Sequence, residues 1–124
     1  MGKYFTEEKA SYKHLLAGAQ MNVVTEEVTV TSGTGDLKAG AVIGLKTADN
    51  KGALCDKSKS DGTQTPYGIL LHDADTTSAD TVVTVAVTGE FIEDNLTFGG
   101  DTTANDVRVA ASARNIYFRK LVNK

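Results

Sequence analysis

Apolar and polar positions follow two different periods along this chain, and the change falls near residue 23. Before it, Tyr12, Leu15 and Leu16 have the spacing of one helical face. That stripe covers only about two turns, which is too short for an isolated helix to be stable in water. We therefore expect residues 1–22 to form a flexible arm that orders on a partner, and residues 23–124 to form the folded domain.

Beyond that point valine, isoleucine and threonine dominate short runs that are separated by turn residues. β-Branched residues favour strands over helices, and Asn-, Asp- and Gly-rich groups mark the turns between them. Pro66 fixes one backbone angle just before a strand, and Gly89 is expected to end the longest run, TVVTVAVT. The predicted strands cover residues 23–31, 41–45, 67–71, 81–88 and 116–118.

One credible helix lies near the C-terminus, over residues 104–114. Thr102 or Thr103 is expected to cap its start, and Asn115 to end it in a left-handed conformation. A basic tail, residues 119–124, follows the last strand. The pattern alone therefore predicts a small β barrel or sandwich with one C-terminal helix.

Charge is distributed unevenly along the chain, although the formal net charge is only −3. No Lys or Arg occurs between Lys59 and Arg108, whereas nine Asp and Glu do. We expect this acidic centre to form a solvated acidic face, which would repel nucleic acid. No apolar run is long enough to span a membrane, and no signal peptide is recognisable, so a soluble cytosolic protein without membrane contact is expected.

Residues with catalytic or metal-binding chemistry are few and poorly spaced. His14 and His72 do not form a metal pair, and the single cysteine, Cys55, is expected to be a small buried apolar residue. Glu90 and Glu93 resemble paired carboxylates, but at a strand end we expect exposed charges that discourage unwanted strand pairing. The chain is therefore predicted to be no enzyme and to hold no cofactor or metal.

Residues 60–91 also carry a family resemblance. The order DG-x-x-x-P-Y-G-I-L, an acidic loop, T-S-A-D, a valine-rich strand and V-T-G-E-F resembles the lambda-type head decoration proteins (protein D family) of tailed bacteriophages. The phrase DLKAGAVIG stands where that family has a similar glycine-rich phrase. The family's Trp-Pro phrase is absent, since Ile92, Glu93 and Asp94 follow instead, and this leaves the subunit contacts open.

The resemblance implies a β-clip pseudo-barrel encoded by a phage or prophage. It implies a structural protein that binds the outside of expanded heads as a homotrimer and stabilises them. Its partners would be its own copies and the major capsid protein. The resemblance also implies localisation to the capsid exterior of the virion, and to the host bacterial cytoplasm during assembly.

The arm is the expected capsid contact. Its aromatic residues have no evident place in a core that begins near residue 23, and arms of this kind often add a strand to another protein's sheet. In the family the N-terminal segment faces the capsid shell. The candidate contacts are Lys3, Tyr4, Phe5, Tyr12, His14, Leu15 and Leu16. The alternative is an arm that packs back on its own domain.

Two other functions stay open at this point. A carrier or swivelling β-hairpin module is suggested by LKAGAVIG, but Lys38 and Lys51 lack the flanking methionine typical of a modifiable lysine. A small-molecule-binding β barrel would require a sizeable apolar cavity.

Overall fold

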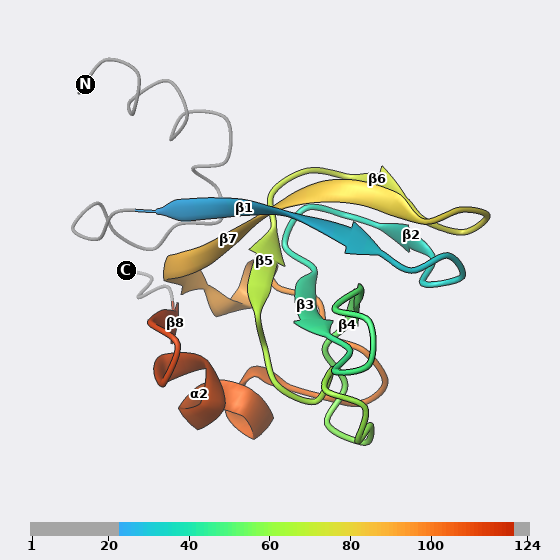
Figure 1. The fold of residues 1–124 in the computed structure, drawn as a ribbon. Helices are drawn as coiled ribbons and strands as arrows, with labels where there is room; N and C mark the ends of the chain where they lie inside the picture. Colours follow the sequence, from blue (N-terminus) through green and yellow to red (C-terminus); the bar gives the residue numbers. More distant parts are fainter. Residues whose placement is uncertain (1–22, 121–124) are drawn as a thin grey trace, which may run out of the picture.

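Five strands close into a ring in the computed structural model, which describes residues 23–120 (Figure 1). Their hydrogen-bonded order is β1-β4-β3-β5-β7, and β7 pairs back with β1. The strands are β1 (Val24–Val30), β2 (Asp36–Leu37), β3 (Val42–Leu45), β4 (Gly52–Leu54), β5 (Gly68–Leu70), β6 (Ala74–Asp75), β7 (Thr81–Ile92) and β8 (Ile116–Arg119). A 3-10 turn, η2 (Glu93–Asn95), and the helix α2 (Ala104–Ser112) lie between the last two strands.

This architecture confirms a mainly β, barrel-like domain with one α-helix near the C-terminus of the described part of the chain. The assignment to the β-clip type stays a prediction. The arm, residues 1–22, and the end of the basic tail, residues 121–124, lie outside the described residues.

The ring is closed firmly on one side of β1 and only loosely on the other. On the firm side, β1 runs antiparallel to β7 from Val24↔Thr88 to Val30↔Thr81. On the other side it meets β4 through one parallel pair, Val30↔Gly52. The rest of that edge of β1 has no neighbouring strand among the described residues.

Two hydrophobic clusters explain why the sequences of several strands are unbroken apolar runs. An inner cluster fills the ring, and an outer cluster lies between the ring and α2 with β8. Neighbouring residues of one strand go to opposite clusters, because side chains alternate across a sheet. These pairs, with the inner residue first, are Ile43 and Val42, Leu70 and Ile69, and Val85 and Ala86. Strands that are buried on both faces lose the usual apolar–polar alternation.

The helix α2 begins where the sequence predicts and ends two residues earlier than predicted, at Ser112 instead of residue 114. Thr103 is its N-cap, and the Thr103 backbone amide donates to Asp106 Oδ2 at 2.7 Å. Thr102 has another role, since its buried hydroxyl accepts from the Lys57 amide at 2.8 Å. Asn115 follows the helix in the left-handed region with φ of 67°. The turn there sends β8 back beside β7, so the helix covers the outer cluster (Figure 1).

The longest strand, β7, continues beyond its predicted end at Gly89, so that prediction is wrong. Before Gly89, β7 pairs with β1 and β5, and from Gly89 onward it pairs in parallel with β8. Gly89 has φ of 142°, and its amide donates to Asn115 O at 3.0 Å. Glycine adopts such an angle without a steric penalty, so here it lets the strand change partner instead of ending it.

Candidate interaction surfaces

The predicted capsid-contact residues all belong to the arm and therefore lie outside the described residues. The structure neither brings them together nor separates them. Within residues 23–120 the surfaces that remain are the polar ends of the barrel, the edges of its strands and the side that carries α2.

His72 and Cys55 are held by local structure. The Thr84 amide donates to His72 Nε2 at 3.1 Å, so the imidazole extends the contact between the end of β5 and β7. Cys55 is fully buried, and desolvation raises the pKa of its thiol to about 12. That thiol stays protonated and unreactive near neutral pH. No group of three or more metal-ligating side chains occurs within residues 23–120.

Glu90 and Glu93 are not the exposed edge charges that the sequence suggested. Glu93 is only 14% exposed, and its Oε1 accepts from Arg108 Nη2 at 2.8 Å. Glu90 is 19% exposed and lies 3.5 Å from Arg119 Nη2. Helix α2 and strand β8 bring these arginines to the end of β7, which sequence spacing alone does not reveal.

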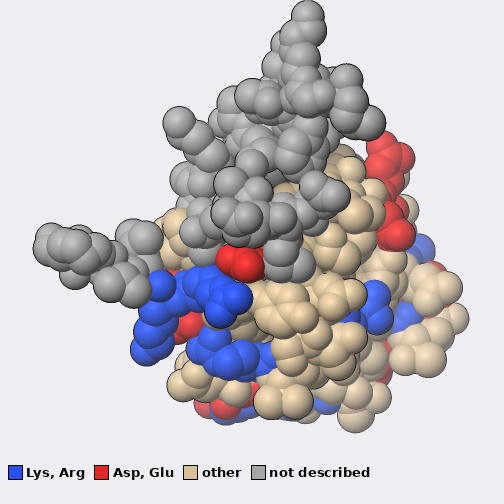
Figure 2. All heavy atoms as spheres, turned by 90° about the vertical axis from the view of Figure 1, so that its left-hand side faces the viewer, with Lys and Arg blue, Asp and Glu red and all other residues tan. Residues whose placement is uncertain are grey.

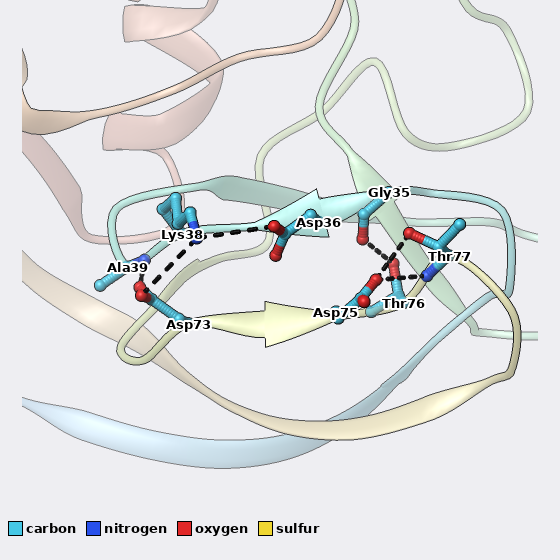
Figure 3. A network of polar contacts seen from close by, with 8 residues as sticks. All are labelled: Gly35, Asp36, Lys38, Ala39, Asp73, Asp75, Thr76 and Thr77. Atoms are coloured by element: carbon cyan, nitrogen blue, oxygen red, sulfur yellow. Dashed lines mark hydrogen bonds and ion pairs between the residues drawn. The ribbon is translucent and has the colours of Figure 1, made fainter.

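The small β2–β6 ribbon at one end of the barrel is tied together by acidic residues (Figure 3). The Ala39 amide donates to Asp73 Oδ1 at 2.9 Å, and Lys38 Nζ lies 3.6 Å from Asp36 and 4.0 Å from Asp73. Asp75 accepts from the hydroxyl and amide of Thr77 (Figure 3), and these hydrogen bonds lower the pKa of the carboxyl. The carboxylates thus fix two short strands that make only two residue pairs.

The acidic centre of the sequence does not form the simple acidic face that we expected. Lysines from the first half of the chain meet it in space: Lys51 Nζ lies 2.7 Å from Asp80, and Lys57 Nζ lies 3.2 Å from Asp106. The hydrogen bond from Lys51 also lowers the pKa of Asp80. Basic side chains gather on the side of the molecule that carries α2 and β8 (Figure 2). The fold therefore mixes charges that the sequence keeps apart.

The open edge of β1 faces a groove, which we call the seam. It lies between β1 and the turn that joins β3 to β4, and it is lined by Glu26, Glu27, Leu45, Asp49, Lys51 and Tyr67. The Tyr67 hydroxyl donates to Glu26 Oε1, and the Arg114 guanidinium lies 4.7 Å from the centre of the Tyr67 ring. The hydrogen bond to Glu26 raises the pKa of Tyr67. These contacts join β1, the segment before β5 and the end of α2 at one side of the seam.

The backbone of β1 offers hydrogen bonds to the seam. The Thr31 amide donates to Gly52 O at 2.9 Å on the β4 side. Backbone groups of successive residues point to alternate sides of a strand, so Thr29, Glu27 and Thr25 face the same side as Thr31. Apart from the contact at β4, the described residues provide no strand that pairs with this edge. The opening could not be predicted, because nothing in the run VTEEVTV tells which edge of the strand lacks a partner.

A comparison with models of protein families identifies the family of this chain. A family model described as bacteriophage lambda head decoration protein D matches residues 4–115. The chain belongs to this family. Among curated proteins, none matched the chain. The match includes most of the arm and the whole barrel, and it supports a capsid decoration role at the exterior of the virion.

Membership of a structural family also weighs against the two other functions that the sequence left open. The lysines that a carrier module would present freely are engaged, Lys38 with Asp36 and Lys51 with Asp80. The interior of the ring is filled by the inner cluster, which is where a ligand-binding barrel would have its cavity.

No helix within residues 23–120 is long and apolar enough to cross a membrane.

Proposed function

We propose that this protein binds the outside of expanded phage heads as a homotrimer and stabilises them against the internal pressure of the packaged DNA. The observation that carries the proposal is the family match over residues 4–115. The major capsid protein of a tailed phage is the partner, and the arm is the main contact. The protein acts without catalysis and without binding nucleic acid or membrane. It is present in the host cytoplasm until the head is decorated.

The mechanism is thermodynamic linkage. A ligand that binds the expanded lattice and not the unexpanded or dissociated shell shifts the equilibrium toward the expanded lattice. Three arms on one trimer bind together, so contacts that are weak singly add up to tight binding. Each arm has about 20 residues and spans at most about 70 Å when fully extended.

Sedimentation analysis of the full chain, followed by mixing with expanded heads, tests this proposal. We expect a trimer that co-sediments with expanded heads and raises their thermal stability. Deleting residues 1–20 should abolish co-sedimentation and leave the circular dichroism spectrum and thermal transition of the domain unchanged. A truncated protein that binds as well as the full chain would disprove the role of the arm.

A matched pair of variants separates the arm from the domain surface. Replacing Tyr4, Phe5 and Tyr12 with serine should remove most of the binding, because these side chains provide the apolar contact area of the arm. Val82→Ser changes an exposed apolar residue of the barrel, which is 60% exposed, and should bind like the parent. An equal loss of binding to expanded heads in both variants would contradict a contact made mainly by the arm.

A further inference from the structure

We infer that the seam accepts the basic C-terminal segment, residues 120–124, of a second copy of this chain, as an added strand on β1. The inference rests on the proposed homotrimer and names the two surfaces that join its subunits. An exposed strand edge is a template for pairing with another chain, and addition of an extended segment to it is a common mode of recognition.

The backbone of β1 supplies the first part of the argument. Glu27 directs its amide and carbonyl away from β7, into the seam, and Thr25 directs its own to the same side just beyond the lining of the seam. The side chains of Leu45 and Tyr67 at the seam are only partly buried and extend the inner cluster toward it. An added strand would complete both the hydrogen bonding and the apolar packing at this place.

Charge identifies the occupant. The seam carries Glu26, Glu27 and Asp49, and the two cations beside it are already engaged. Lys51 lies 2.7 Å from Asp80, and Arg114 lies over the Tyr67 ring. A second β1 edge would bring glutamates against glutamates, and like charges directly opposite each other destabilise a sheet. Arg119 ends β8 and lies beside Glu90, and the residues after it read KLVNK, with two basic residues, no acidic residue and two aliphatic residues. This segment fits both the charge and the apolar floor of the seam.

The segment of the same copy cannot reach the seam as a paired strand. Arg119 lies opposite Ile92 of β7, and Glu27 lies opposite Thr84. These two positions on β7 are eight residues apart (92 − 84), or about 26 Å along a strand. The five residues after Arg119 span at most about 17 Å, and β8 runs away from the seam. The occupant must therefore come from a neighbouring copy.

Such a contact joins two different surfaces, the tail of one copy and the seam of the next. Contacts of this kind close into rings when the rotation between copies permits, whereas a contact between identical surfaces gives a twofold dimer. The basic side of the molecule, beside α2 and β8, would then face the acidic seam of its neighbour (Figure 2). A contact of this type gives a threefold ring when each copy is rotated by one third of a turn relative to its neighbour.

A charge exchange in the full-length protein tests the inference by sedimentation equilibrium. Glu27→Lys alone and Lys120→Glu alone should each raise the dissociation constant of the trimer at least tenfold. The double variant should return it to within a few-fold of the parent, because the opposite charges meet again. Deleting residues 121–124 should dissociate the trimer even if the charge variants change its dissociation constant only slightly. Circular dichroism confirms that each variant is folded.

The outcomes separate this inference from the proposed function. A trimer that is unaffected by the tail deletion and by both charge variants refutes the seam contact, while capsid binding by the full chain still upholds decoration. A trimer that dissociates only when residues 1–20 are deleted identifies the arm as the occupant and overturns the inference. A full chain that is monomeric overturns both the trimer and the seam contact. High salt should weaken the parent trimer if charge contributes as argued.

Discussion

Arg108 is the side chain that most clearly joins the helix to the barrel, and replacing it tests how the C-terminal part is held. Its Nη2 donates to Glu93 Oε1 and to Asn105 Oδ1, both at 2.8 Å. Its Nη1 donates to Phe118 O at 3.0 Å, on the edge of β8 that faces away from β7. Arg108→Met keeps most of the aliphatic stem and removes all three hydrogen bonds.

The expected cost follows from what loses its partner. Glu93 is 14% exposed and would keep a carboxylate with little solvation, and the Phe118 carbonyl would lose its donor. Hydrogen bonds to charged groups contribute about 1.5–3 kcal/mol each. Arg108 is itself 35% exposed, so water replaces part of what is lost, and we expect about 2 kcal/mol in total.

Arg119→Met is the matched control. Arg119 is 55% exposed and lies 3.5 Å from Glu90, and exposed pairs of this kind contribute about 0–1 kcal/mol. Urea unfolding followed by far-ultraviolet circular dichroism measures both variants. The midpoint for Arg108→Met should fall by about 1 M, given a slope of about 2 kcal/mol per molar urea. Equal midpoints for the two variants would refute the reasoning that burial and the carbonyl contact distinguish them.

Three further predictions concern the core, a glycine and the carboxylates. Cys55 should resist alkylation in the folded protein at pH 8 and react in denaturant, since its thiol is buried with a pKa of about 12; rapid native alkylation would contradict this. Gly44→Ala should destabilise strongly in thermal unfolding, because its Cβ would lie 2.7 Å from the Thr63 backbone. Gly33→Asn has open space around the new side chain but a positive φ of 85°, which asparagine tolerates better than other residues, so it should destabilise less than Gly44→Ala. The pKa values of Asp61 and Asp75 are lowered by hydrogen bonds from Thr63 and Thr77. Because the folded pKa lies below the unfolded value of about 3.9, this stability is present above that value and is lost as pH falls through the folded pKa. Replacing both aspartates with asparagine should flatten the acid limb of a plot of unfolding midpoint against pH, and an unchanged limb would show that other carboxylates dominate.

Local features of the fold could be predicted because they depend on neighbouring residues. β-Branched runs specified β1 and the first part of β7. Thr103 caps the start of α2 and Asn115 adopts the left-handed conformation, both as expected. The continuation of β7 through Gly89 could not be predicted, because it depends on the Asn115 carbonyl that arrives from 26 residues further along the chain (115 − 89).

The surfaces were less accessible to prediction than the strands. The pairing of Arg108 with Glu93 depends on where the helix packs, and the opening beside β1 depends on how little of β4 reaches it. Neither is encoded in a local pattern. The predicted capsid contacts belong to the arm, so they stay a prediction that the capsid-binding experiments address.

The late position of β7 in the chain has a consequence for synthesis. Val24 pairs with Thr88, which is translated 64 residues later (88 − 24). At about 5–20 residues per second this interval lasts roughly 3–13 s. During it neither edge of β1 has its final partner, and an unpaired strand edge invites aggregation. Glu26 and Glu27 place two charges in the middle of this otherwise β-branched strand, and charged side chains disfavour pairing at an open strand edge.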